Sequence, residues 1–177
     1  MTRVQQAPSG GGRVSMSAAM ISVPETLKAA RAAVTAKDYE RAEVLLRQAL
    51  EVVPDNLPAL DLLGFVLYFS GRPEEGEEAC RRALEVNPDH AYAHKGLGLN
   101  LAKRGGDLDE AIGHIRRAIE LKPDWFDPNW DLVVTLAEAG RIEAAQTELE
   151  RARQFFPDYG RRWAAMAAEL ERRGKAR

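Results

Sequence analysis

Four prolines recur at a nearly constant interval along the chain. Pro54, Pro88, Pro123 and Pro157 are separated by 34, 35 and 34 residues, and each has an alanine five positions before it and an aspartate directly after it. A fixed period of about 20 to 50 residues is typical of stacked-repeat proteins, in which each unit buries its apolar face only against its neighbours. The period therefore predicts a solenoid and argues against most enzyme folds, but it does not identify a partner.

The residues between the prolines have the spacing of amphipathic helices. Apolar and small residues recur three or four positions apart, and no stretch alternates apolar and polar residues over strand lengths. Gly105-Gly106 interrupts the pattern within the third unit, and Asp107 is a suitable N-cap for the helix that follows. The predicted helices are residues 24–36, 39–52, 57–70, 73–86, 91–104, 108–121, 126–139 and 142–155. Each unit thus holds a pair of helices.

Glycines within these helices indicate close packing between them. A glycine in a helix interior costs about 1 kcal/mol relative to alanine. Gly64, Gly76 and Gly98 therefore predict places where neighbouring helix axes approach so closely that a larger side chain would push them apart.

The third unit, residues 91–125, resembles the tetratricopeptide repeat family most clearly. It contains Leu97-Gly98, then Ala111, then the segment 118–123 that ends in proline, which match the Leu-Gly, Ala and Pro positions of the 34-residue family unit. This unit is one residue longer than the family pattern, and the extra residue falls in the glycine turn. The resemblance implies an all-α fold, a right-handed α-solenoid of four helix-turn-helix repeats with a C-terminal capping helix.

The repeat pattern divides the chain into six segments. A run of serine and three glycines at residues 9–12 favours an unfolded start, and a basic stretch ends the chain. The predicted segments are a disordered leader (1–22), repeat 1 (23–56), repeat 2 (57–90), repeat 3 (91–125), repeat 4 (126–159), and a capping helix with a basic tail (160–177).

Composition narrows the classes of partner. The net charge is −2, so the chain has no electrostatic basis for general nucleic-acid binding. The single cysteine, Cys80, fits a reducing compartment and predicts a cytoplasmic protein. No apolar run approaches the length of an integral membrane segment. The alanine- and arginine-rich composition favours a bacterial source.

No catalytic constellation is evident in the sequence. His90 and His94 are four residues apart and could share a helix face, but no cysteine or carboxylate at matching spacing completes a metal site. Cys80 stands where a packing aromatic is expected, so we expect a buried thiol rather than a nucleophile. We therefore predict no enzyme activity, no catalytic residue, no metal and no cofactor.

The family resemblance implies that the first helix of each pair lines a concave groove in which peptides bind. Residues carried onto that face include five aromatic side chains from three repeats. The predicted peptide-binding residues are Asp61, Phe65, Tyr68, Phe69, Tyr92, Lys95, Leu99, Lys103, Asp127, Trp130, Val134 and Glu138. The alternative is that Phe65 and Trp130 simply pack between helices or against the leader.

Related co-chaperones use such a groove as a carboxylate clamp made of lysine, asparagine and arginine. Here Lys95 matches one clamp position, but Leu99 and Asp131 occupy the next ones, so recognition of an acidic C-terminus is not expected. The sequence instead favours a non-enzymatic scaffold or adaptor that binds an extended or helical peptide segment of a protein partner. The alternatives are a secretion-type chaperone for an exported protein and a self-assembling, homo-oligomeric scaffold.

Overall fold

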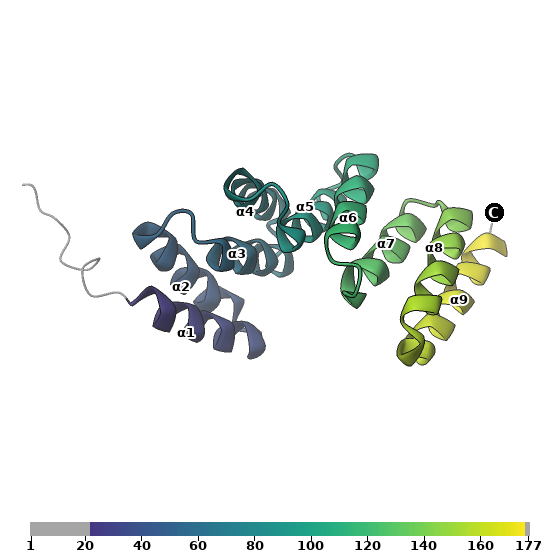
Figure 1. The fold of residues 1–177 in the computed structure, drawn as a ribbon, viewed down its shortest axis with the longest axis horizontal. Helices are drawn as coiled ribbons and strands as arrows, with labels where there is room; N and C mark the ends of the chain where they lie inside the picture. The colour runs from purple at the N-terminus through teal and green to yellow at the C-terminus, as the bar shows by residue number, and fades with distance from the viewer. Residues whose placement is uncertain (1–21, 176–177) are drawn as a thin grey trace, which may run out of the picture.

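The computed structural model describes residues 22–175, and this part of the chain is helical, with no strand (Figure 1). The predicted leader lies outside the described residues except for Ser22, as do the last two residues of the basic tail. The helices in chain order are α1 (Val23–Thr35), α2 (Tyr39–Val52), α3 (Leu57–Phe69), α4 (Pro73–Val86), α5 (Ala91–Lys103), α6 (Leu108–Leu121), α7 (Phe126–Glu138), α8 (Ile142–Phe155), the short 3₁₀ turn η2 (Pro157–Tyr159) and α9 (Gly160–Lys175). None of these helices is both long enough and apolar enough to cross a membrane.

The predicted helix ends of the four pairs agree with the structure to within one residue. Side-chain capping fixes the starts of α2, α3 and α6, where a polar side chain accepts a hydrogen bond from a backbone N–H that would otherwise lack a partner. Asn56 Oδ1 accepts from the Ala59 amide at 3.0 Å, and Asp107 Oδ1 accepts from the Asp109 amide at 2.8 Å. The predicted N-cap role of Asp107 is thereby confirmed.

The turn inside each repeat uses a left-handed backbone conformation. Gly71, Gly105 and Gly140 have φ values of 74°, 73° and 72°, and Lys37 takes the corresponding place in the first repeat at 60°. Glycine adopts this conformation without the steric cost that a side chain adds. The extra residue of the third repeat is Gly106, which follows this position and lies just before the cap of α6.

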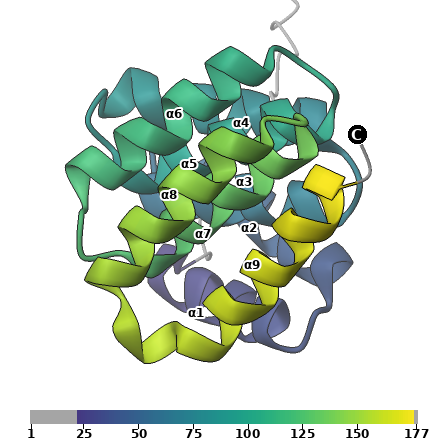
Figure 2. The ribbon, with the colours of Figure 1, turned by 90° about the vertical axis from the view of Figure 1, so that its right-hand side faces the viewer.

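The helices stack in one continuous array. Each helix packs against the next in the chain, and α3 also contacts α1 and α5. The first helices of the pairs, α1, α3, α5 and α7, therefore follow one another along one face of the stack (Figure 1). Figure 2, seen from the C-terminal end, shows α9 lying beside α8.

The predicted capping helix is present, and its apolar side packs on the last repeat. Trp163 and Leu170 are buried in one cluster with Phe126 and Leu149. The indole Nε1 of Trp163 also donates to the carbonyl oxygen of Phe156 at 2.9 Å. The cap thus removes from water the apolar surface that a fifth repeat would otherwise cover.

Helices approach closely at glycines, as predicted. A Cβ atom added at Gly98 would lie 2.6 Å from Ile115 Cγ1 and 2.7 Å from the carbonyl oxygen of Ala111. A Cβ at Gly64 would lie 2.7 Å from the sulfur of Cys80. Gly113 differs, because it lies on α6 with open space around its Cα.

Two glycine-to-alanine substitutions distinguish the effect of packing on stability from the effect of helix propensity. Gly113→Ala should stabilise the fold by about 0.5–1 kcal/mol, since alanine restricts the unfolded chain and meets no neighbour. Gly98→Ala gains the same propensity but overpacks the α5–α6 contact, so we expect a net loss of about 1–3 kcal/mol. Urea unfolding followed by circular dichroism measures both. Stabilisation by Gly98→Ala would contradict the packing described here.

Candidate functional site

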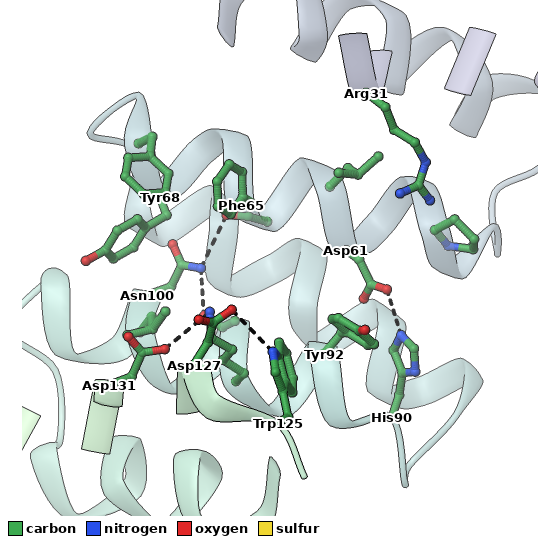
Figure 3. A pocket seen from close by; sticks show the side chains of 17 residues that line it. Arg31, Asp61, Phe65, Tyr68, His90, Tyr92, Asn100, Trp125, Asp127 and Asp131 are labelled. Atoms are coloured by element: carbon green, nitrogen blue, oxygen red, sulfur yellow. Dashed lines mark hydrogen bonds and ion pairs between the residues drawn. The ribbon is translucent and has the colours of Figure 1, made fainter. Parts of the chain in front are cut away.

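A groove of about 680 Å³ opens on the face formed by the first helices (Figure 3). Its walls come from α1, α3 and α5 and from the start of α7. The lining residues are Arg31, Pro58, Asp61, Leu62, Gly64, Phe65, Tyr68, Phe69, His90, Tyr92, Lys95, Gly96, Leu99, Asn100, Trp125, Asp127 and Asp131.

Most of the predicted groove residues line this cavity. They are Asp61, Phe65, Tyr68, Phe69, Tyr92, Lys95, Leu99 and Asp127. The structure therefore brings together residues from three consecutive repeats that the family resemblance placed on one face.

The other four predicted residues do not line the cavity. Lys103 lies at its rim, where its ammonium donates to the carbonyl oxygen of Tyr68 at 2.6 Å and sits 4.1 Å from the centre of the Tyr68 ring. Trp130 is half-buried, with its ring 5.5 Å from that of Trp163 and 4.6 Å from the guanidinium of Arg162. Its surroundings match the alternative of packing between helices. Val134 and Glu138 lie further along α7.

Two aromatic groups form the walls of the groove. Phe65 and Phe69 have ring centres 4.6 Å apart and remain 40% and 49% exposed. Across the groove, Tyr92 packs on Trp125 at 4.4 Å and is 48% exposed. Exposed aromatic rings on a concave surface provide contact area for an apolar side chain.

One hydrogen bond and one ion pair cross the floor between these walls. His90 Nε2 lies 2.7 Å from Asp61 Oδ2, and Lys95 Nζ lies 3.2 Å from Asp131 Oδ2. Burial raises the pKa of both carboxyl groups, and the hydrogen bond from His90 to Asp61 and the charge of Lys95 beside Asp131 oppose this only in part. Because Lys95 already has a carboxylate partner, it is poorly placed to hold a second one from a ligand.

Asn100 lies in the floor of the groove near Tyr68 and Asp131 (Figure 3) and is almost wholly buried, with 1% of its surface exposed. Its Nδ2 donates to the carbonyl oxygens of Gly96 at 2.8 Å and Gly64 at 3.4 Å, while Oδ1 has no partner. The absence of a side chain at Gly76 makes room for this amide, since a Cβ there would collide with it. The glycine at this position, where the family pattern has alanine, thus avoids a collision with the side chain of Asn100.

Sequence reasoning missed several lining residues that the register could have revealed. Arg31 occupies the same place in its helix as Phe65 and Leu99, 34 and 68 residues later. His90 and Trp125 both stand directly before a first helix. Asn100 could have been noticed for a different reason. It is a polar residue at the repeat position where the preceding repeat has the buried Val66.

The histidines and the cysteine lie in different surroundings. His94 contacts His114 rather than His90, with 2.9 Å between their Nδ1 atoms. Among residues 22–175 no three potential metal ligands cluster.

Cys80 is buried, and burial raises the pKa of its thiol to about 12. A thiol in that state is protonated at neutral pH and is not a nucleophile.

The hydrogen bonds of the histidine pair determine which nitrogens carry protons. His94 Nε2 donates to the carbonyl oxygen of Pro88 at 2.9 Å, so the Nδ1 of neutral His94 accepts from His114 Nδ1. Protonating both rings would place two N–H groups against each other. Burial, and then the neighbouring His94, lower the pKa of His114.

This pair predicts a loss of stability in mild acid. Because the folded chain lowers the pKa of His114, the unfolded chain takes up this proton first as the pH falls below the ordinary pKa of about 6.5. The melting temperature should therefore fall as the pH drops through about 6.5. His114→Gln should show a shallower fall when thermal melts are compared at several pH values. The same pH dependence in both proteins would argue against this assignment.

The chain is similar to known repeat proteins along most of its length. A family model described as Tetratricopeptide repeat matches residues 33–98 and 104–170. The uncharacterized protein y4yS of Sinorhizobium fredii is 36% identical over 84 residues, which cover 48% of this chain and 46% of that protein. The probable biofilm formation methyltransferase WspC of Pseudomonas putida is 32% identical over 83 residues, 47% of this chain and 19% of that protein. The chain thus spans less than half of either relative.

Solved structures show the same arrangement of helices. TTC0263, a thermophilic tetratricopeptide repeat protein of Thermus thermophilus, superposes with a TM-score of 0.73 over 83% of this chain and 82% of its own, at 21% identity. YrrB, described as a tetratricopeptide repeat protein with an unusual peptide-binding site, gives a TM-score of 0.69 over 87% and 76% of the two chains, at 27% identity.

Proposed function

The chain belongs to the tetratricopeptide repeat family, whose stacked helices are scaffolds for protein–protein interaction, and we propose that its groove binds an extended or helical segment of a partner protein. In this proposal the chain is a non-enzymatic adaptor that acts in the cytoplasm. Solenoids of this kind offer an extended concave surface for such contacts.

The observation that carries the proposal is the exposed aromatic wall of the groove. Phe65, Phe69 and Tyr92 leave large parts of their rings in water, although burying an aromatic side chain is among the strongest sources of stability in a fold. A contiguous exposed apolar patch in a concave site marks a binding surface. The groove volume also lies within the range of about 300–1,000 Å³ that is common for ligand sites.

The second helices offer a contrasting surface. Their exposed charges pair across repeats: Arg47 meets Glu75 at 2.9 Å, and Arg81 meets Glu110 at 2.9 Å. Charges that already have partners within the chain present fewer free groups to a ligand. The groove is therefore the better candidate for the binding face.

Two alternative functions differ from this proposal in the molecule that covers the exposed apolar side chains. A secretion-type chaperone would hold an apolar segment of an exported protein in the same groove, and co-purification with that protein distinguishes it. A self-assembling scaffold would use exposed apolar groups outside the groove, such as Phe155 at 66% exposure. A strict monomer in light scattering at high concentration argues against self-assembly.

Peptide selection with matched variants tests the proposal. Dodecapeptides selected from a random phage-displayed library on the full chain should bind in the micromolar range, about −8 kcal/mol. The double substitution Phe65→Glu and Tyr92→Glu places charges on both walls, so we expect at least a tenfold loss, about 1.4 kcal/mol. Fluorescence anisotropy measures the affinities, and circular dichroism confirms that helices are retained.

Phe155→Glu is the control, because it makes the same aromatic-to-glutamate change, with one added charge instead of two, at an exposed aromatic outside the groove. It should leave the affinity of the selected peptides unchanged. Peptides that bind the groove variant as well as the wild type would place the binding site elsewhere. Failure to select any peptide would also contradict the proposal.

A further inference from the structure

The lysines that face the groove are already engaged within the chain. Lys95 Nζ lies 3.2 Å from Asp131 Oδ2, and Arg162 also attracts that carboxylate. At the rim, Lys103 Nζ donates to the carbonyl oxygen of Tyr68 at 2.6 Å and lies 4.1 Å from the centre of its ring. A carboxylate of a bound segment would have to displace one of these contacts, and beside Asp131 it would be repelled by a like charge.

The carboxylates of the groove have partners of their own as well. Asp61 is hydrogen-bonded to His90 at 2.7 Å and is attracted by Arg31. Asp127, at the start of α7, accepts from the indole Nε1 of Trp125 at 3.2 Å. A cation of a bound segment would therefore compete with groups of the chain for each of these carboxylates. Charged groups of both signs thus already have partners in the groove.

The aromatic wall formed by Tyr92 and Trp125 lies apart from Phe65 (Figure 3) and already carries two lysines. Lys95 Nζ lies 5.4 Å from the centre of the Trp125 ring, and Lys122 Nζ lies 5.1 Å from the centre of the Tyr92 ring. Lys122 also donates to the hydroxyl oxygen of Tyr92 at 3.2 Å. A cation within about 6 Å of an aromatic face is attracted to it, so a further cation at this wall would meet like charges.

Phe65 and Phe69 form the wall that lacks such contacts. Among the described residues no lysine or arginine lies over either ring, and the two residues are 40% and 49% exposed. Tyr39 of α2 stacks on Phe69 with 5.6 Å between the ring centres and supports it from one side. Leu99 of α5 lines the same cavity. The side chains of Phe65, Phe69 and Leu99 present only carbon atoms to the groove.

We propose that Phe65, Phe69 and Leu99 form the anchoring subsite of the groove, and that this subsite takes an uncharged apolar side chain of the bound segment, such as leucine or methionine. The inference rests on the proposed function, since it assigns a chemical class to the occupant of the same groove. An apolar anchor buries carbon surface on both sides of the contact, which is favourable in water. It also leaves the contacts of Lys95 and Asp61 in place.

A charged side chain is disfavoured at this subsite. It would lose its hydration against a wall of carbon atoms without gaining a hydrogen bond or an opposite charge there. A neutral anchor also determines how the affinity responds to salt, because salt screens contacts between charges and has little effect on apolar contacts. The affinity should therefore change by less than about twofold between about 50 mM and about 500 mM sodium chloride.

The test uses four pools of fluorescein-labelled nine-residue peptides with identical mixed flanks of alanine, serine, threonine and glutamine. The central residue is leucine, norleucine, lysine or glutamate. Norleucine is the matched partner of lysine, since it has an unbranched apolar stem without the ammonium group. The leucine and norleucine pools should bind the full chain at least about tenfold more tightly than the lysine and glutamate pools, as measured by fluorescence anisotropy.

Substitutions show whether the preference arises at the proposed subsite. Phe65→Ala and Phe69→Ala each remove a partly exposed ring, so both variants should keep their helices, which circular dichroism checks. Both should reduce the ratio of norleucine-pool to lysine-pool affinity. Phe155→Ala is the matched control, because it makes the same change at an exposed phenylalanine outside the groove, and it should leave the ratio unchanged.

The outcomes separate this inference from the proposed function. Equal binding of the norleucine and lysine pools, lost in the Phe65→Glu, Tyr92→Glu variant, overturns the apolar subsite and leaves the groove as a binding site. A norleucine preference that persists in both Phe65→Ala and Phe69→Ala places the apolar anchor elsewhere and also overturns the subsite. A tenfold loss of norleucine-pool affinity at high salt does the same. If no pool binds, both proposals fail.

Discussion

Close contact between first and second helices at glycine is the constraint on which the rest of this structure depends. Gly98 lies against Ile115 and Ala111, and Gly64 lies against Cys80, with no room for a Cβ atom at either place. A solenoid has no central core, so its stability and its pitch come from such repeated neighbour contacts. Because the contacts recur with the repeat period, they place the first helices in register along one face.

The groove follows from that register. Equivalent positions of α1, α3 and α5 fall beside one another, so Arg31, Phe65 and Leu99 line one cavity although 34 residues separate each from the next. Gly76 lies on α4, behind the groove, and the absence of a side chain there makes room for the amide group of Asn100. The same close packing that holds the helices together thus also sets which polar atoms reach the groove floor.

The fold could be predicted from the sequence because it depends on local and periodic signals. Proline spacing, helical periodicity and the cap at Asp107 are all visible along the chain, and the helix ends follow from them. The groove could be predicted only in part. Trp130 occupies the same place in its helix as Asp61 and Lys95, but it packs on Trp163 of α9, and the position of a capping helix carries no periodic signal. The hydrogen bond of His90 with Asp61 and the ion pair of Lys95 with Asp131 depend on side-chain geometry between repeats, which spacing alone does not specify.

The indole N–H signals of the three tryptophans offer the most direct test of the groove as the binding face. Trp125 lines the groove and donates to Asp127 at 3.2 Å, whereas Trp163 is buried beneath the cap. Two-dimensional ¹H–¹⁵N NMR of the full chain during titration with a selected peptide follows each signal, and single Trp→Phe variants assign them. Binding in the groove should shift the Trp125 signal with peptide concentration while the Trp163 signal stays in place. A bound peptide that shifts the Trp163 signal and leaves Trp125 unchanged would contradict it.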